Sequence, residues 1–520
     1  MAGNEIHLEK APRAAAPGRL RACRGVSISR MTFIFFAVCA LPILLPSPLH
    51  PADGWQGDLR LTNDPGSSFP PPNNCKNIAV DGAGRIHVVW ADSRDKNYEI
   101  YHKYLSEGAW SEDTRLTFDT ADSKRPNLAV DILGRVHLAW NDLRDGNMEI
   151  YHMMWDGSWG PEERVSFSQA DSYASSMASE GYNIHMVYQE DVDGTIRIVY
   201  RSFDLFAWSA PEYLSSVESG RSMVPAVAAG PDGSVHAAWW NEGTDPEGTG
   251  FNRIRYREKT GEWSPEETIS GPEAEAMRPS IVVDDSGRVH VAWIDKRGSF
   301  EQIYYRYRGD SGWEDEICLT KSECTHYHPS LALSGGGLRL VYWANIPSES
   351  NPGVFFMERE DASWSSALRV SSESSRASLC AIAAGAEGIL HVAWKDDRDG
   401  NEEMYYNSYL PPGTGVEDQD EPPGPVPAPP GLSIHASPNP FNQSTTLTLG
   451  VPGELPVEIR IYDIRGRFVR RIASISCPGG THTFAWDGRD DAGRRVGGGV
   501  YMAKATAGKM SASAKILLLR

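Results

Sequence analysis

The chain has 520 residues, 40% of them hydrophobic, and a formal net charge of -19. A single hydrophobic core stops growing at about 250 to 300 residues, so this length predicts more than one domain. The acidic balance repels phosphate backbones and anionic membrane surfaces, so nucleic acid is not an expected partner. The 49 Gly, 35 Pro and 16 Trp residues are typical of a turn-rich all-β protein.

Residues 1–52 are predicted to be a signal or leader region. Several arginines precede an apolar run, Phe33 to Leu45, that Pro46 and Pro48 close. The run is shorter than the roughly 20 apolar residues of a membrane-spanning helix. An uncleaved anchor is the alternative, because no clear small-x-small cleavage site follows. We expect an exported protein that is secreted or held at the cell surface.

Residues 53–409 contain one motif seven times. Aligned on the His of "GRIHVVW", the units are spaced by 50, 48, 51, 54, 49 and 52 residues. The aligned residues are His87, His137, His185, His236, His290, Arg339 and His391. Each unit holds four short β-like runs separated by turns, as in "NLAVD", "RVHLAWND", "EIYHMMW" and "EERVSF". This period is typical of propeller blades and predicts a seven-bladed β-propeller.

The start of this region is predicted to complete the last blade. Six units carry a Trp before their fourth strand, but the seventh ends at "MYYNSYLPPG" without one. The segment "WQGDLRLT", which begins at Trp55, closely matches "WSEDTRLT", which begins at Trp110. If the first segment pairs with the last blade, no open sheet edge remains between the two ends. We therefore expect Leu59 to lie near Tyr405 in a closed ring.

Units such as "AVDILGRVHLAWNDLRDGNMEIYHMMWDGSW" resemble the neuraminidase-type Asp-box (BNR-like) repeat propellers, over residues 55–409. The family box is Ser-x-Asp-x-Gly-x-Thr-Trp, of which fragments remain here, such as Asp156, Gly157 and Trp159. Active sialidases of that family use an Arg triad, a Tyr and Glu pair, an acidic residue and a Phe-Arg-Ile-Pro signature, usually on six blades. This chain has no Arg-Ile-Pro and seven units. The resemblance therefore implies the architecture more than the activity.

The turns between second and third strands carry acids and bases in four blades. The candidate ligand-binding residues are Asp92, Arg94, Asp142, Arg144, Asp295, Arg297, Asp397 and Arg398. These turns should share one rim of the propeller with the loops "DSKRP" and "THYHP", and loops on a rigid scaffold often carry function. Turn geometry and duplication of an ancestral blade explain the same charges without a ligand. No residue is assigned a catalytic role.

No cofactor is expected. The aligned His residues each belong to a different blade, so they cannot converge on one metal ion, and hydrogen bonding to nearby backbone or acids is the better interpretation. Asp191 and Asp193 in "EDVDGT" are a weaker calcium candidate, because the distal bidentate Glu of a full calcium loop is absent. His326 and His328 are interpreted as polar surface rather than as a zinc site.

Five cysteines follow the leader: Cys75, Cys318, Cys324, Cys380 and Cys477. Cys318 and Cys324 are close enough in sequence for a local disulfide, which an exported protein could keep. The alternative is that both are small buried hydrophobic residues.

Residues 410–431, "PPGTGVEDQDEPPGPVPAPPG" and its neighbours, are predicted to be a Pro-rich acidic linker. Residues 432–520 then hold about seven short strands, among them "TTLTLGV", "VEIRIYD" and "VYMAKAT". So many strands in under 100 residues predict an immunoglobulin-like β-sandwich.

The ordered segments "SPNPFNQSTTLTL", "VEIRIYDIRGRFVRRI" and "WDGRDDAGRR" resemble the immunoglobulin-like domain of the flagellar hook capping protein. They are also similar to the terminal sorting domains of type IX secretion substrates. The resemblance implies passage to, or attachment at, the cell surface, with secretion machinery as a partner. A plain accessory sandwich is the alternative. Asp463, Gly466, Asp487, Gly488 and Gly493 are then turn formers.

Together these patterns indicate a secreted or surface-displayed monomer. Its propeller rim is expected to bind an extracellular glycan or protein without catalysis. The alternative is a glycoside hydrolase (sialidase-like) or lyase that uses acidic rim residues. A purely structural spacer is a third possibility.

Overall fold

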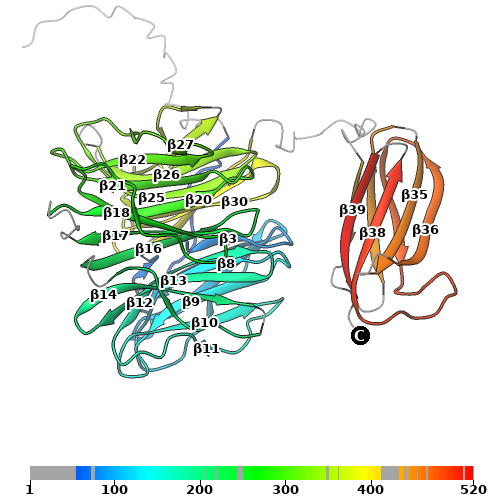
Figure 1. The fold of residues 1–520 in the computed structure, drawn as a ribbon, viewed down its shortest axis with the longest axis horizontal. Helices are drawn as coiled ribbons and strands as arrows, with labels where there is room; N and C mark the ends of the chain where they lie inside the picture. Colours follow the sequence, from blue (N-terminus) through cyan, green and yellow to red (C-terminus); the bar gives the residue numbers. More distant parts are fainter. Residues whose placement is uncertain are drawn as a thin grey trace, which may run out of the picture. The chain divides into compact units, whose positions relative to one another are not determined.

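The structure is a computed structural model. It describes residues 54–71, 76–204, 206–216, 220–242, 250–346, 351–360, 362–411, 432–437, 441, 444–453, 455–463, 467–507 and 510–518. The predicted leader, 1–52, and all but the start of the predicted linker lie outside these residues. The chain forms two compact units, Met1–Tyr409 and Leu410–Arg520 (Figure 1). No helix in the described ranges is long and apolar enough to cross a membrane.

The described part of the first unit forms seven antiparallel sheets, most of them four-stranded, as expected for propeller blades (Figure 1). The first sheet consists of β2 (Ser68–Phe69), β3 (Ile78–Val80), β4 (Ile86–Asp92), β5 (Glu99–Ser106), β6 (Ala109–Trp110) and β7 (Thr114–Arg115), and the second of β8 (Ser123–Val130), β9 (Val136–Asp142), β10 (Glu149–Trp155) and β11 (Glu163–Arg164). The third sheet consists of β12 (Ser172–Glu180), β13 (Asn183–Val192), β14 (Thr195–Phe203) and β15 (Glu212–Tyr213). The fourth sheet consists of β16 (Arg221–Ala229), β17 (Val235–Glu242), β18 (Arg253–Lys259) and β19 (Glu267–Thr268). The fifth sheet consists of β20 (Ala276–Val283), β21 (Val289–Asp295), β22 (Gln302–Gly309), β23 (Gly312–Trp313) and β24 (Ile317–Cys318). The sixth sheet consists of β25 (Thr325–Ser334), β26 (Gly337–Asn345), β27 (Gly353–Glu360), β28 (Ser363–Trp364) and β29 (Leu368–Arg369). The last sheet consists of β30 (Ala377–Ala384), β31 (Leu390–Asp396) and β32 (Glu403–Tyr409), together with β1 (Leu59–Arg60). The all-β prediction is confirmed.

The core of this unit lies between neighbouring sheets. Every residue of β4, β9 and β21 is buried, which explains why their sequences are apolar on both faces. Ala292 and Ile294 of the fifth sheet pack with Leu340 and Tyr342 of the sixth in one cluster. Burial of each such side chain contributes about 1.5 to 3 kcal/mol, so packing between sheets outweighs local hairpin preferences.

The first described segment pairs with the last sheet. β1 is antiparallel to β32, with Leu59 opposite Tyr406 and Arg60 opposite Tyr405. One hydrophobic cluster combines Trp90 of the first sheet with Met404 and Tyr406 of the last. The predicted pairing of the tryptophan-led segment with the last sheet is therefore confirmed.

Edge-to-face aromatic pairs connect each sheet to the one before it. A Trp near the outer strand of one sheet packs on a ring of the third strand of the preceding sheet, with ring centroids 4.9 to 5.5 Å apart. The pairs are Trp110–Tyr406, Trp159–His102, Trp208–His152, Trp263–Tyr200, Trp313–Tyr256, Trp364–Tyr305 and Trp55–Phe356. Such contacts contribute about 0.5 to 1.5 kcal/mol each beyond area burial. This explains why the Trp recurs with the period of the sheets.

The inner strands of the sheets surround a common space. Strands β3, β8, β12, β20, β25 and β30 line one cavity of about 270 Å³, which we call the central cavity. In β8, β12, β25 and β30 the residues that line the cavity come in the second half of the strand, and the starts of these strands lie outside the lining.

The described part of the second unit contains seven strands in two sheets, which confirms the predicted sandwich. One sheet is β33 (Ser433–Ser437), β34 (Thr445–Val451) and β37 (Gly480–Trp486); the other is β36 (Phe468–Cys477), β35 (Leu455–Asp463), β38 (Gly499–Ala507) and β39 (Met510–Leu518). Trp486, Leu447 and Ile459 lie in its fully buried core.

The disulfide that the spacing of Cys318 and Cys324 left open is not formed, because both thiols are free. Cys318 lies at the end of the short strand β24, where burial raises the pKa of its thiol. The buried sulfur of Cys324 contacts Ser322 Oγ at 3.1 Å and His326 Nε2 at 3.5 Å. The alternative of buried, unpaired thiols fits Cys324, and Cys75 lies outside the described residues.

Candidate functional site

The recurring Asp of the predicted rim is an internal hydrogen-bond acceptor. Asp92 ends β4 and is fully buried. Its carboxylate accepts hydrogen bonds from Trp90 Nε1 at 2.9 Å, Ser68 Oγ at 2.7 Å and Arg94 Nη2 at 2.7 Å. Burial opposes ionisation of the carboxyl group, but the effect of these hydrogen bonds is larger and keeps the pKa of Asp92 below its ordinary value.

The recurring Arg connects the second, third and fourth strands of its own sheet. The Arg94 guanidinium stacks 4.3 Å from the Tyr101 ring, and its Nη1 lies 2.9 Å from Asp113 beside the outer strand. The same arrangement recurs as Arg144 with Asp142, Tyr151 and Glu162; Arg297 with Asp295, Tyr304 and Glu316; and Arg398 with Asp396, Tyr405 and Asp58. Each guanidinium is thus occupied within its sheet, so these residues brace the sheet. Ligand binding by them stays a prediction.

One member of the predicted set was placed in the wrong register. Asp396, not Asp397, ends its strand, accepts from Trp394 Nε1 and binds Arg398 at 2.5 Å. Asp397 instead lies 3.1 Å from Arg376. Two adjacent aspartates made the assignment ambiguous from sequence, and the strand end resolves it.

In the first, second and fifth sheets the aligned His bonds to an acid of its own sheet, as expected. Trp159 Nε1 donates to His102 Nδ1, which leaves His102 Nε2 to donate to His87 Nδ1 at 3.0 Å. His87 Nε2 then donates to Asp81 at 3.1 Å. In four other sheets a tyrosine hydroxyl contacts the Nδ1 of the aligned His. Among the described residues, no group of three or more His, Cys, Asp or Glu could hold a metal ion.

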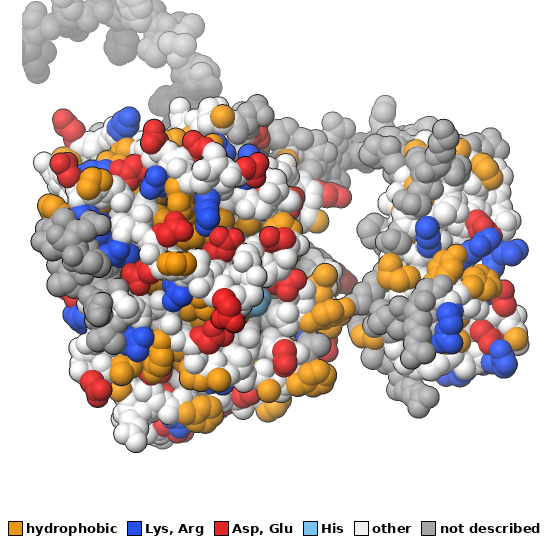
Figure 2. Space-filling view, in the orientation of Figure 1, with side chains coloured by type: hydrophobic (Ala, Val, Ile, Leu, Met, Phe, Trp, Pro, Cys, Tyr) orange, Lys and Arg blue, Asp and Glu red, His pale blue; other side chains and the backbone are white. Residues whose placement is uncertain are grey.

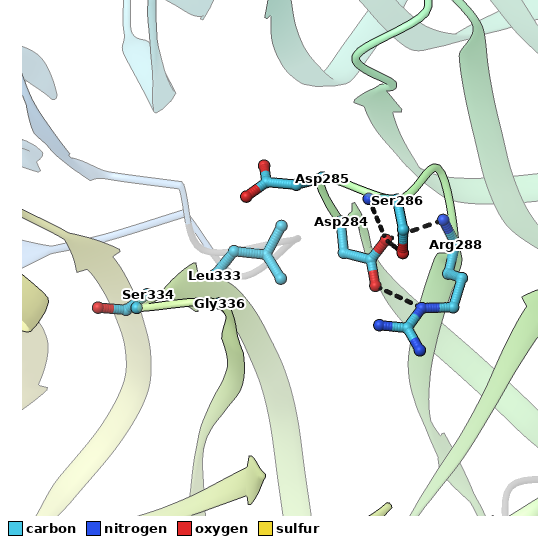
Figure 3. Close-up of a pocket in the computed structure, with 8 residues that line it drawn as sticks. Asp284, Asp285, Ser286, Arg288, Leu333, Ser334 and Gly336 are labelled. Atoms are coloured by element: carbon cyan, nitrogen blue, oxygen red, sulfur yellow. Dashed lines mark hydrogen bonds and ion pairs between the residues drawn. The ribbon is translucent and has the colours of Figure 1, made fainter. Parts of the chain in front are cut away.

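In the fifth sheet, the Asp that contacts the aligned His also shapes the turn after the inner strand. Asp284 accepts hydrogen bonds from Ser286 and from the backbone and side chain of Arg288, and these bonds hold its pKa well below the ordinary value despite burial (Figure 3). The turn borders a pocket of about 290 Å³ with Leu333 and Ser334 of the next sheet. The Asp284 carboxylate in this pocket is thus occupied by its own turn.

The weaker calcium candidate is a hairpin turn. Asp191 Oδ1 accepts from the Gly194 amide at 2.9 Å, and Asp193 has a φ of 53°. An aspartate that caps its own turn explains the pattern without an ion.

A backbone feature that the sequence analysis missed recurs on the inner strands. In six sheets the third or fourth residue of the inner strand has a left-handed φ between 47° and 58°, at a break in the ladder to the next strand. These bulge residues are Arg125, Ala174, Val224, Arg278, His328 and Leu379. Non-glycine residues with this φ are uncommon and cost about 1 to 3 kcal/mol each. A strained bulge repeated six times around one end of the central cavity points to a use for that end.

Three bulge residues are Arg or His, and they act on one another electrostatically. Burial lowers the pKa of Arg125, and the neighbouring Arg278 lowers it further. Burial lowers the pKa of His328 to about 3, and Arg278 again contributes. On the face of the propeller seen in Figure 2, by contrast, acidic and basic side chains lie interspersed. Arg125 and Arg278 therefore place positive charge on the inner strands of an acidic protein, whereas the low pKa of His328 leaves its imidazole neutral near pH 7.

Aromatic rings flank Arg125 and the uncharged His328. The Arg125 guanidinium lies 5.8 Å from the Tyr173 ring. Trp343 stacks on Tyr327 at 4.3 Å and on His328 at 6.4 Å. All of these side chains are partly exposed, so their faces are accessible to a ligand.

A sequence signal for this site exists. In the second, fifth and sixth sheets the bulge reads "KRPN", "MRPS" and "YHPS", with a basic residue or His directly before Pro. Pro has no amide hydrogen to give to the ladder, so it is tolerated at a bulge. The loops "DSKRP" and "THYHP" were predicted to surround the channel mouth, but their Arg125 and His328 were not chosen as candidates.

Comparisons with known proteins support both units. Residues 437–511 match the family model of the FlgD Ig-like domain, so the resemblance to the hook capping protein is confirmed. Solved structures similar to the chain include a polysaccharide lyase, PL25 ulvan lyase (13% identity, 66% of this chain and 95% of that chain, TM-score 0.44), and Hadza microbial sialidase Hz136 (10%, 60% and 74%, 0.41). A protein of unknown function from Dyadobacter fermentans is also similar (10%, 68% and 98%, 0.44).

These similarities to sialidase and lyase propellers concern the arrangement of the sheets alone. A search among curated proteins found no match. The described residues therefore define an all-β protein with seven antiparallel sheets in its first unit and a match to the FlgD Ig-like domain in its second.

Proposed function

We propose that the propeller binds an acidic extracellular glycan, without cleaving it, at the end of the central cavity where the bulges lie. The observation that carries this proposal is the position of Arg125 and Arg278 at the bulges of the inner strands of the second and fifth sheets, close enough for Arg278 to lower the pKa of Arg125. Burial and this neighbouring like charge both disfavour the charged form of Arg125. A carboxylate or sulfate between them would offset both effects, since charge-assisted bonds from Arg are strong and often bidentate.

The rings beside Arg125 and His328 favour a glycan over other anions. Tyr173, Tyr327 and Trp343 offer large, partly exposed faces next to Arg125 and His328. Ligand sites commonly combine such aromatic faces with a few oriented polar groups. An acidic sugar chain presents both ring faces and anionic groups.

The remaining parts of the proposal concern architecture and location. The pairing of β1 with β32, and the contacts of Trp55 and Trp110 across the first and last sheets, support a ring of seven blades closed by the N-terminal strand. The FlgD Ig-like domain supports export, with this domain serving secretion or attachment at the cell surface. We propose that the protein acts there as a monomer.

A hydrolase or lyase is the second candidate, and the geometry favours it less. A hydrolase needs two carboxylates that face each other across a pocket. The recurrent acids Asp92, Asp142 and Asp295 are buried and bonded to Trp and Arg of their own sheets. They are therefore committed to the fold.

The test is a glycan array probed with the exported chain and with the double variant Arg125→Ala/Arg278→Ala. We expect binding to uronate-containing or sulfated glycans, and a loss of at least about tenfold in the variant, because hydrogen bonds to charged groups contribute about 1.5 to 3 kcal/mol each. The matched control is Arg494→Ala/Arg495→Ala, which removes the same charge from exposed positions of the second unit. Equal binding of neutral glycans, or unchanged binding by the first variant, contradicts the proposal. New reducing or unsaturated ends in the bound glycan would favour the enzyme.

A further inference from the structure

Lys76 reaches across the inner strands of the propeller. Its Nζ donates hydrogen bonds to the carbonyl oxygens of Met177 on β12 and Val227 on β16, at 2.9 Å each. Lys76 itself lies two residues before the start of β3 of the first sheet. One ammonium therefore bridges the first, third and fourth sheets at the wall of the central cavity.

This lysine comes from a longer connection than the other sheets have. Seven residues separate Phe69 from Asn77, whereas two separate Lys124 from Asn127. The comparison is in register, because Asn77 and Asn127 each donate to a carbonyl of the second strand, on Val89 and Ala139. At the position of Lys76 the second, fourth, fifth and sixth sheets have Pro. The ammonium is thus an addition specific to the first sheet.

The central cavity combines this ammonium with mostly apolar walls. Its lining includes Ile78, Leu128, Leu331 and Ile382, with the hydroxyl-bearing Ser179, Ser280 and Ser330. Lys76 is the only charged residue in the lining that the structure describes. An apolar cavity with a few convergent polar groups is the usual form of a small-molecule site.

The ammonium is incompletely compensated. Burial lowers the pKa of Lys76 to about 8, with no contribution from a carboxylate. Two carbonyl dipoles compensate a charge less well than an anion would in the same surroundings. An anionic group in the cavity would therefore stabilise the charged lysine.

We propose that the central cavity binds a small monocarboxylate with an apolar body, its carboxylate on Lys76 Nζ and its body against the aliphatic walls. A volume of about 270 Å³ lies just below the roughly 300 to 1,000 Å³ of sites for drug-sized ligands, so the ligand is small. One ammonium neutralises one negative charge, which disfavours phosphate esters and other dianions. None of the bulge residues lines the central cavity, so this site does not depend on the proposed glycan binding.

The experiment measures binding of hexanoate to the full chain by calorimetry, with hexanamide and hexylamine as matched probes. Hexanoate should bind at pH 7, hexanamide should bind at least about tenfold more weakly, and hexylamine should not bind. Hexanoate should also bind more weakly at pH 9.5, since Lys76 loses its proton and no other charged side chain lines the described cavity wall.

Two variants separate the site from a merely structural lysine. Lys76→Met should lower hexanoate affinity at least about tenfold. Ala383→Phe, which fills the cavity from its wall and leaves Lys76 in place, should lower the affinity as well. Arg125→Ala/Arg278→Ala should bind hexanoate like the parent, so failure of the glycan proposal leaves this result unaffected. Equal affinity for hexanoate and hexanamide, no hexanoate binding at millimolar concentrations, or unchanged binding by Ala383→Phe would each overturn the proposal.

Discussion

Arg60 Nη2 lies 2.7 Å from Glu403 Oε1, although the two residues are 343 positions apart in the chain. The same pair occurs within the first sheet as Arg115–Glu99 and within the second as Arg164–Glu149. In the first and second sheets the outer-strand Arg comes from the same sequence repeat as the Glu. In the last sheet it comes instead from the first described segment of the chain.

This equivalence predicts equal stability effects. Arg60→Ala should lower the free energy of unfolding of the propeller by about 1 to 3 kcal/mol, because it leaves the buried Glu403 carboxylate without its cation. Arg115→Ala should have a similar effect through Glu99. Urea unfolding followed by tryptophan fluorescence measures both, with Arg494→Ala as the neutral control. An effect of Arg60→Ala close to zero would mean that β1 adds nothing to the last sheet.

The bracing role of the recurring Arg gives a second prediction. Arg94→Ala should destabilise the propeller by about 2 kcal/mol, because the buried Asp92 loses its guanidinium partner. Glycan affinity should change less than twofold, since Arg94 is occupied by Asp92, Asp113 and Tyr101. Thermal unfolding and the array measure the two effects separately. A large loss of glycan binding without loss of stability would restore the predicted rim site.

The buried imidazoles predict loss of stability in acid. Burial lowers the pKa of His185, His236 and His391 to about 4, below the value of about 6.5 in an unfolded chain. Below pH 6.5 the unfolded state therefore binds more protons than the folded state. Stability is fully present above pH 6.5 and falls as the pH drops toward 4, by about 1 kcal/mol per imidazole between pH 7 and 5.5.

Urea midpoints at pH 7.5, 6.5, 5.5 and 4.5 measure this loss. His236→Gln removes one such group, so the variant should lose less stability per pH step than the parent, even if it is weaker at pH 7.5. Parallel pH curves for variant and parent would show that His236 does not contribute.

The bulges predict an unusual response to glycine. Ala174 has a φ of 58°, so Ala174→Gly should leave stability unchanged or raise it by up to about 1 kcal/mol. Ala139 lies in the regular, buried strand β9, and Ala139→Gly should destabilise by about 1 kcal/mol or more. Thermal unfolding of the two variants side by side checks the difference. Equal destabilisation would show that the bulge stores no strain.

The repeat of the sequence was sufficient to predict the sheets and their partners. Strand and hairpin formation depend on alternation and turn residues within about ten positions, and a buried His or Trp must return whenever its sheet does. For that reason the period of His87 and Trp110 predicted seven units, and the match between Trp55 and Trp110 predicted the pairing of β1 with β32.

The roles of polar residues depended on contacts that no local pattern encodes. The sequence predicted Asp92 and Arg94 as ligand-binding residues of the rim. In the structure both side chains bind residues of their own sheet. Cys318 and Cys324, only six positions apart, remain unpaired because one borders an outer strand and the other is buried beside His326.

Both proposed sites depend on the width of the space inside the propeller. Arg125 and Arg278 belong to different sheets, and only the arrangement of the sheets brings them within electrostatic reach. Lys76 likewise meets carbonyl oxygens from the third and fourth sheets. The sequence by itself determined the local strands, their repeat and the order of the units. The tertiary structure alone decided which charges meet, because distances across the inner strands follow from how the sheets pack together.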